Sequence, residues 1–379
     1  YDLTSSSPTY PVLFLTNPAP ETGDNFGFSV AISGTRVVVG AWLDDAGASS
    51  AGSAYVYDIA SATPTTPVAV LNNPEPEVGD RFGHSVGISG PKVVVSAYLD
   101  DAGTVYVYEL ASATPTTPVL TIHKPNPVVG DLFGRSLAIS GNRIVVGANR
   151  DDTGATDSGS AYVYDLTSAT PSMPVLTLNN PTPGADDNFG QSAAIIGDRV
   201  VIGAQNDDAS ASEEGTVYVY DLASATPASP ITTIHNPVPN VGDQFGFAVG
   251  ADGNKVVVGA PFDDAVGLNK GYAYVFGVGL PEIAVAQPAA TDLTGGSGSL
   301  AVGTLIGSSG TAKTFVIKNT GTGDLTGLAV TKDGSHASQF TVGALGSTTV
   351  IPGGSTTFNV TFAPGGTATG TRTAALHIA

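Results

Sequence analysis

Paired aspartates are the most regular polar feature of the sequence, and each pair follows a valine-rich run. The ten residues are Asp44, Asp45, Asp100, Asp101, Asp151, Asp152, Asp207, Asp208, Asp263 and Asp264. Paired carboxylates beside loop carbonyls are suitable hard-oxygen ligands for calcium, and Asp157, Glu213 and Glu214 would add further oxygens. The same pairs would equally cap turns, with one aspartate accepting backbone N–H bonds and the other solvated. Recurrence in five copies favours the turn-capping role. Calcium is the one cofactor that these residues suggest.

The pairs recur because the sequence is built from a repeat. Five Asp-x-Phe-Gly turns begin the copies, 51 or 56 residues apart. Their phenylalanines are Phe26, Phe82, Phe133, Phe189 and Phe245. The turn aspartates, such as Asp24 and Asp131, are expected to fix the turn so that the phenylalanine enters the space between neighbouring copies.

Each copy predicts four strands. A short strand follows the turn, and a β-branched run such as Val37–Val39 then indicates a strand buried on both faces. Aromatic alternation as in Tyr55–Tyr57 places both rings of the third strand on one face. A fourth strand begins at a proline, as at Pro67. Four strands at a period near 50 are typical of a β-propeller blade.

Counting strands predicts a closed ring of five blades within residues 1–279. The fifth copy lacks a fourth strand, and the fourth-strand pattern appears early, at Pro11 to Leu15. We therefore expect this N-terminal strand to complete the last blade, which would also remove the exposed sheet edges.

The copies resemble the FG-GAP repeat of integrin alpha-chain propellers and bacterial surface proteins. The resemblance rests on Phe-Gly followed by Gly-Ala, and Gly259-Ala260-Pro261 carries the full Gly-Ala-Pro. The integrin propellers have seven blades and a calcium loop between their first and second strands. That loop is absent here, where the turn is only Ser33-Gly34-Thr35-Arg36 or its equivalents, so integrin-type calcium binding does not carry over.

Residues 280–379 predict a second all-β domain after a Gly/Ser-rich linker at Thr294 to Ser299. Several short alternating strands indicate an immunoglobulin-like β-sandwich. Segments such as Lys318–Gly321 and Ile351–Ser355 resemble the immunoglobulin-like choice-of-anchor and ASPM/SPD-2/Hydin-type modules of bacterial surface proteins. Those modules usually continue into one more strand, which the sandwich is expected to lack. Simple truncation of the sequence is the favoured explanation, since open edges are usually avoided, and the alternative is that a partner or a neighbouring copy supplies the last strand by strand addition.

Two aromatic residues are candidates for ligand contact. Trp42 and Tyr98 occupy a loop position where the other copies have Asn149, Gln205 and Pro261. Such variation is what a ligand-contacting surface or an unconstrained surface would show. The histidines have no acid or nucleophile at an interpretable spacing, and no hydrolase, metalloprotease or phosphate-loop motif is present. The sequence therefore predicts a protein that is not an enzyme.

Composition limits the partners. The 33 acidic and 14 basic residues among 379 give a formal charge of −19, which disfavours nucleic acid and anionic lipid. No apolar run is long enough to insert in a membrane, and there is no cysteine. The resemblances imply an extracellular or cell-surface adhesion protein that binds a protein or glycan ligand through the propeller loops. The alternatives are a structural subunit that self-associates through the C-terminal sandwich edge and, third, a propeller enzyme acting on polysaccharide.

Overall fold

The structure is a computed structural model that describes residues 11–208, 212–264, 270–278, 283–287, 291–293, 312–319, 325–351, 354–363 and 372–378. The chain divides into two compact units, Tyr1–Phe276 and Gly277–Ala379, and the boundary expected after residue 279 lies close to this division. The regular secondary structure of the described residues consists of strands and one short 3-10 helix, η1 (Ala337–Gln339). None of their helical segments has the length and apolar character needed to cross a membrane.

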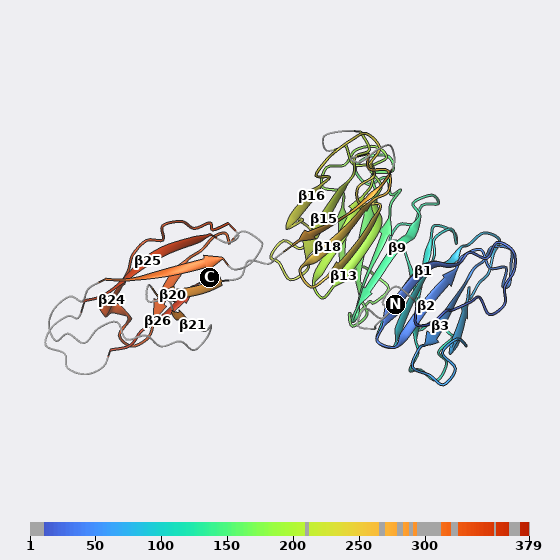
Figure 1. The fold of residues 1–379 in the computed structure, drawn as a ribbon, viewed down its shortest axis with the longest axis horizontal. Coiled ribbons are helices and arrows are strands. Elements are labelled where there is room, and N and C mark those ends of the chain that lie inside the picture. Colours follow the sequence, from blue (N-terminus) through green and yellow to red (C-terminus); the bar gives the residue numbers. More distant parts are fainter. Residues whose placement is uncertain are drawn as a thin grey trace. The chain divides into compact units, whose positions relative to one another are not determined.

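The first unit consists of five antiparallel sheets, the blades, which follow one another along the chain (Figure 1). Within each blade the strands lie side by side in chain order. Blade 1 contains β1 (Phe26–Ser33), β2 (Arg36–Ala41), β3 (Ser53–Asp58) and β4 (Ala69–Asn72). Blade 2 contains β5 (Phe82–Ser89), β6 (Lys92–Ala97), β7 (Thr104–Glu109) and β8 (Leu120–His123). Blade 3 contains β9 (Phe133–Ser140), β10 (Arg143–Ala148), β11 (Ser160–Asp165) and β12 (Leu176–Asn179). Blade 4 contains β13 (Phe189–Ile196), β14 (Arg199–Ala204), β15 (Thr216–Asp221) and β16 (Thr232–His235), and blade 5 contains β17 (Ala248–Asp252), β18 (Lys255–Ala260) and β19 (Tyr272–Gly277).

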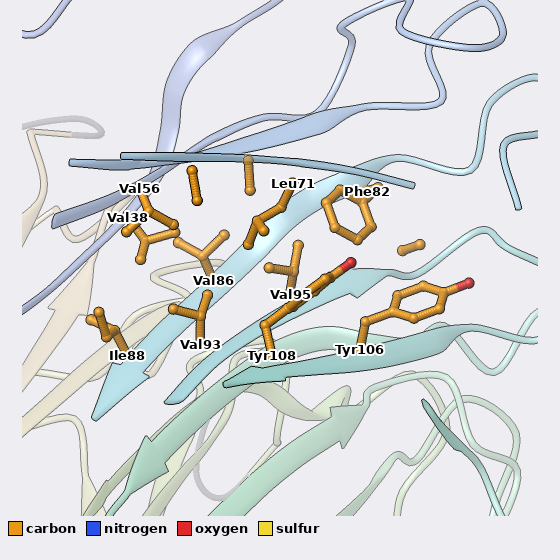
Figure 2. Close-up of a cluster of buried hydrophobic side chains, with 13 residues drawn as sticks. Val38, Val56, Leu71, Phe82, Val86, Ile88, Val93, Val95, Tyr106 and Tyr108 are labelled. Atoms are coloured by element: carbon orange, nitrogen blue, oxygen red, sulfur yellow. The ribbon is translucent and has the colours of Figure 1, made fainter. Parts of the chain in front are cut away.

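The core of the unit lies between blades, and the strand sequences explain why. On β7, Tyr106 and Tyr108 pack with blade 1, whereas Val107 between them packs with blade 3, because successive side chains of a strand point to opposite faces. Figure 2 shows the cluster between blades 1 and 2, where Val38 and Leu71 of blade 1 face Phe82 and other side chains of blade 2. The expectation that the Phe-Gly phenylalanines enter the space between blades is confirmed at this junction.

A bulge at the start of the first strand positions one residue of each blade. In blade 1, Phe26 pairs with Ala41 and the next pair is Ser29 with Gly40, so residues 27 and 28 leave the ladder. Gly27 has a φ of 90°, which glycine adopts at little cost. Equivalent register shifts occur in blades 2, 3 and 4. The residue after the Phe-Gly dipeptide is thereby turned out of the sheet.

The two ends of the row of blades are exposed. Val30 on β1 is 66% exposed, whereas its equivalent in blade 2, Val86, is 7% exposed. At the other end, Val275 on β19 is 67% exposed, whereas its equivalent in blade 4, Val219, is fully buried. Side chains that are buried at the internal junctions therefore face solvent on β1 and β19.

The prediction that an N-terminal strand at Pro11 to Leu15 completes the last blade is wrong for this structure. Residues 11–19 form no strand, and among the described residues the last sheet has three strands. Leu15 instead packs on the core of blade 1, and Tyr57 donates a hydrogen bond to the Thr16 carbonyl at 3.3 Å. The segment thus lies against blade 1, but without a neighbour that offers it a free strand edge it gains no ladder hydrogen bonds.

The second unit contains two antiparallel sheets around one apolar cluster that includes Ile317, Phe358 and Leu328. The five-stranded sheet has the order β21 (Thr291–Leu293), β20 (Ile283–Gln287), β22 (Lys313–Asn319), β25 (Ser355–Phe362) and β24 (Phe340–Val342). The other sheet pairs β23 (Val330–Asp333) with β26 (Ala375–Ile378). The expected linker at Thr294 to Ser299 lies outside the described residues.

Candidate functional site

The first aspartate of each pair anchors a tyrosine of the third strand. Asp44 and Asp207 are 7% and 4% exposed, and their Oδ2 atoms accept the hydroxyls of Tyr55 and Tyr218 at 2.7 and 2.5 Å. The same bond is made in the other three blades. The pairs are Asp100 with Tyr106, Asp151 with Tyr162 and Asp263 with Tyr274. These carboxylates hold the loop after the second strand to the third strand of the same blade.

The second aspartate shapes the loop itself where its contacts are described. The Oδ1 atoms of Asp45, Asp152 and Asp208 each accept a backbone N–H from five residues further on, at 2.6, 2.9 and 2.6 Å. Asp101 is exposed and has a φ of 51°, and Asp264 is partly buried. The contacts of these pairs are those of turn-capping residues.

Calcium binding by the pairs stays a prediction. In the described ranges, no three carboxylate, histidine or cysteine side chains are grouped so that they could hold a metal ion. Glu214, expected as an extra ligand, is 1% exposed, and the backbone N–H of Asp157 donates to Asp152 Oδ1. The hydrogen bonds thus give the aspartate pairs a structural role, and they do not test whether the pairs bind calcium.

The aspartates of the Asp-x-Phe-Gly turns are buried beside an asparagine, except in blade 3. In blade 2, Asn73 Nδ2 donates to Asp80 Oδ2 at 2.7 Å, and blades 1, 4 and 5 repeat this contact. In blade 3 the asparagine is replaced by Lys124, whose Nζ lies 2.8 Å from Asp131 Oδ2 and 2.9 Å from Asp151 Oδ2. The lysine therefore joins the turn aspartate to the first aspartate of the pair.

The first aspartate of the pair has a different pKa shift in blades 3 and 4. Burial, together with the carboxylate of Asp187, raises the pKa of Asp207 to about 6. Burial alone would also raise the pKa of Asp151, but hydrogen bonds from Thr153, Tyr162 and Lys124 outweigh it and hold that pKa below its usual value. Equivalent carboxylates in two blades thus have opposite shifts.

The two predicted ligand contacts, Trp42 and Tyr98, belong to a set of side chains at equivalent positions of the five blades that we call the variable strip. Each blade contributes the residue turned out by the Phe-Gly bulge and the residue after the second strand. The strip comprises Phe28 and Trp42, His84 and Tyr98, Arg135 and Asn149, Gln191 and Gln205, and Phe247 and Pro261. The residue after the second strand differs in all five blades, and the bulge residue is of four types, with phenylalanine in blades 1 and 5, whereas the strands around them repeat.

Side-chain contacts link the strip residues of blades 1, 2 and 3, and a separate contact links those of blades 3 and 4. The Trp42 and His84 rings are 5.5 Å apart, and the His84 and Tyr98 rings are 4.3 Å apart. Arg135 Nη1 lies 2.9 Å from His84 Nε2. On the other side of Arg135, Asn149 Nδ2 donates to Gln191 Oε1 at 3.0 Å. The structure thus brings Trp42 and Tyr98 into one cluster through His84.

The strip contains buried polar atoms that have no hydrogen-bond partner within the part of the chain described. They are Trp42 Nε1, His84 Nδ1, Asn149 Oδ1 and Gln205 Oε1, joined by Nε of Arg81 beside the strip. Arg81 lies in the Asp-x-Phe-Gly turn of blade 2, and its guanidinium carbon is 4.4 Å from the centre of the Trp42 ring. A buried polar atom without a partner is costly, so a ligand or ordered water that satisfies several of them would be favoured.

Sequence reasoning missed His84, Arg81 and Arg135. His84 has no companion acid or nucleophile along the sequence, yet it is 7% exposed at the centre of the cluster. The available signal was the residue after each Phe-Gly dipeptide, which is Phe, His, Arg, Gln and Phe in the five copies. Variation at that position, like the variation at Trp42 and Tyr98, is what a ligand-contacting surface or an unconstrained surface would show.

These blades define a class of repeat protein, and comparison with known proteins gives the family. The model of the FG-GAP repeat matches residues 15–57, 66–108, 121–164, 182–220 and 233–276. The chain belongs to the FG-GAP repeat family, as the resemblance in its Phe-Gly and Gly-Ala dipeptides implies.

No curated protein matches the chain. Among solved structures, the Dos1 propeller is similar with 16% identity and a TM-score of 0.41, over 66% of this chain and 56% of that one. The WD40 β-propeller domain of Doa1 is similar with 13% identity and a TM-score of 0.37, over 61% and 59% of the two chains. The present chain therefore spans less than two thirds of either structure.

Proposed function

We propose that this chain is a non-catalytic, extracellular or surface-attached adhesion protein that recognises a protein or glycan through the variable strip. The observation that carries the proposal is the set of unpartnered buried polar atoms in the strip, from Trp42 Nε1 to Gln205 Oε1. A repeat built only for stability would keep these positions alike or apolar, as it does in the strands. Aromatic rings, guanidinium groups and amides in one row are the residue types that protein surfaces use for recognition.

The proposal includes a ring closed by contact between blade 5 and blade 1. The exposed face of blade 5 carries the same residue types that blade 4 buries against blade 5, and the exposed face of blade 1 carries those that blade 2 buries against blade 1. Val257, for example, is 43% exposed, whereas its blade 4 equivalent Val201 is fully buried. Mutual burial of these two faces would remove their exposed apolar side chains from solvent.

Two substitutions test closure. Val30→Asp and Val275→Asp place charges on side chains that are two-thirds exposed in the open row, so they would be harmless there. In a closed ring each charge is buried, and we expect each variant to lose several degrees in melting temperature. Val78→Asp, in a loop at 79% exposure, is the matched control. Unchanged melts for all three would contradict closure.

For the second unit we propose an immunoglobulin-like sandwich formed by the five-stranded sheet and the β23–β26 pair. Both sheets contribute to one apolar cluster, as the two inner faces of a sandwich do. In the described part of the chain β26 has one neighbour only, which leaves an edge where a second copy would add a strand. That edge supports the structural-subunit alternative, in which the protein polymerises as its concentration rises.

The binding function is tested on an array of glycans and peptides with labelled protein. We expect a defined set of hits that Trp42→Ala abolishes. Arg36→Ala is the control, because Arg36 begins β2 while Trp42 follows the end of the same strand. Thermal melts establish that both variants fold. An array without hits, or hits that survive Trp42→Ala, would contradict the proposal.

A further inference from the structure

Two arginines meet at the variable strip without a carboxylate partner. Arg81 lies over the Trp42 ring at 4.4 Å, and the Arg135 guanidinium carbon lies 5.5 Å from the centre of the Tyr98 ring. Within the described ranges, the ion pairs of the molecule involve neither guanidinium. Acidic residues outnumber basic ones by 33 to 14 in this chain, so two arginines near one histidine, with no ion pair among the described residues, stand out.

The hydrogen bond between Arg135 and His84 determines where the histidine proton sits. Arg135 Nη1 can only donate, so His84 Nε2, 2.9 Å away, must accept. Burial, with the charges of Arg135 and Arg81, lowers the pKa of His84 to about 3, so the ring is neutral at pH 7. Its single proton is therefore on Nδ1, a buried atom for which the described residues provide no hydrogen bond of ordinary geometry, although the Arg135 backbone also lies close to the ring. His84 Nδ1 is thus the hydrogen-bond donor of this ring.

Three unpartnered N–H donors thus occupy one cluster. They belong to His84 Nδ1, Trp42 Nε1 and Arg81 Nε. The rings of Trp42 and His84 are 5.5 Å apart, and both rings contact Phe28 at 5.0 Å. Several donors beside two positive charges favour an anionic acceptor. A carboxylate fits best, because its two oxygens match the planar fork of a guanidinium.

The neighbouring part of the strip offers hydrogen-bond acceptors instead of donors. Asn149 Nδ2 donates to both Asn188 Oδ1 and Gln191 Oε1 at 3.0 Å, which fixes the orientation of the amide and leaves its Oδ1 as a free acceptor. Gln205 Oε1 is a second free acceptor one blade further on. Amide oxygens accept from hydroxyl groups. Phe28, 54% exposed, provides an apolar ring face next to the donors.

We propose that the variable strip binds a carboxylated glycan, with the carboxylate at Arg81, His84 and Trp42 and sugar hydroxyls at Asn149 and Gln205. This inference rests on the proposed binding function and names its ligand class. A sugar acid combines a carboxylate, hydroxyl donors and an apolar ring face in one unit, whereas an acidic peptide side chain supplies only the first.

The test uses the full chain and a panel of carboxylated glycans, namely polygalacturonate, alginate, hyaluronate and polysialic acid oligomers. Each is paired with its carboxyl-reduced, neutral counterpart, and oligoglutamate serves as the acidic peptide. Binding is measured by calorimetry. We expect at least one carboxylated oligomer to bind, and its reduced form to bind at least tenfold more weakly. Arg81→Gln and Arg135→Gln should each weaken binding by a similar factor, whereas Arg36→Gln, the charge-matched control at the far end of β2, should not.

The outcomes separate this inference from the proposed function. Hits that are confined to neutral glycans and abolished by Trp42→Ala would contradict the assignment of a carboxylated ligand but would support the binding function. Hits that are confined to oligoglutamate would show that the ligand is an acidic peptide and would contradict the assignment of a glycan. No binding to any carboxylated glycan overturns the inference, and an array without hits of any kind overturns the binding function as well. Melts of the three arginine variants show whether lost binding reflects lost folding.

Discussion

Lys124 Nζ lies 2.9 Å from Asp151 Oδ2 and 2.8 Å from Asp131 Oδ2, with all three side chains at most 7% exposed. The other four blades have asparagine at the position of Lys124. In blade 3 a lysine therefore joins the turn aspartate to the first aspartate of the pair, where the equivalent residue of the other blades is a neutral asparagine.

Removing the lysine charge should destabilise the protein. Lys124→Met leaves Asp131 and Asp151 buried without their cation, and we expect a loss of about 3 kcal/mol in the free energy of unfolding. Lys124→Asn restores the contact found in the other blades, so its loss should be smaller. Urea unfolding of both variants measures the difference. A Lys124→Met variant as stable as Lys124→Asn would show that the ion pairs do not stabilise blade 3.

The same substitution should have opposite effects in blades 3 and 4. Asp207→Asn removes a buried charge while keeping an oxygen for the Tyr218 hydroxyl, so we expect a gain of about 1–3 kcal/mol at pH 7. Asp151→Asn removes a partner of Lys124 and should cost a similar amount. Chemical unfolding at pH 7 checks both. A loss of stability in Asp207→Asn would contradict the account.

Asp207 also predicts a pH dependence. Its pKa of about 6 in the folded state lies above the unfolded value near 4, so the folded state binds more protons between these values. This carboxyl therefore contributes stability that is present below pH 4 and is lost as the pH rises through 6. Asp207→Asn should remove that contribution. Its gain over the native chain should shrink as the pH falls from 7 to 4, and a constant gain would contradict the shift.

Two tyrosines of β15 should respond differently to loss of their hydroxyls. The Tyr218 hydroxyl donates to Asp207 at 2.5 Å, so Tyr218→Phe should cost about 1–3 kcal/mol. The Tyr220 hydroxyl is buried and, within the described residues, unpartnered, so Tyr220→Phe should be neutral or slightly stabilising. Melting curves compare the two variants. Equal losses would mean that the Tyr218 bond adds nothing beyond ring packing.

Calcium distinguishes the two interpretations of the aspartate pairs. The capping contacts of Asp45, Asp152 and Asp208 predict the same melting temperature in excess EDTA and in millimolar calcium. A rise of several degrees with calcium would mean that the native state binds the ion. The pairs would then be metal ligands, contrary to this expectation.

The strands of the blades were predictable because their pattern is local. Three consecutive β-branched residues such as Val93–Val95 require a strand that is covered on both faces, and the structure places them in β6 between two blades. The alternation of Tyr106 and Tyr108 likewise determines which face meets which neighbour. Such patterns need no knowledge of distant residues.

The cluster around His84 was not predictable in this way. Arg135 is 51 residues from His84, and Trp42 is 42 residues away on the other side. They meet because the bulge residue of each of these blades contacts strip residues of the preceding blade, as His84 contacts Trp42 and Arg135 contacts His84. The prediction that the segment at Pro11 to Leu15 completes the last blade failed for a related reason, since pairing of Leu15 with β19 depends on whether the two ends of the row meet.

Trp42 permits the most direct test of the central claim, because it is the only tryptophan in the chain and lies in the variable strip. The measurement is its fluorescence during titration with the strongest ligand found on the array. We predict a saturable change in emission with the same dissociation constant that calorimetry gives, and its loss in Arg81→Gln, whose guanidinium lies over the indole. Ligand that binds by calorimetry without altering the Trp42 emission would contradict recognition by the strip.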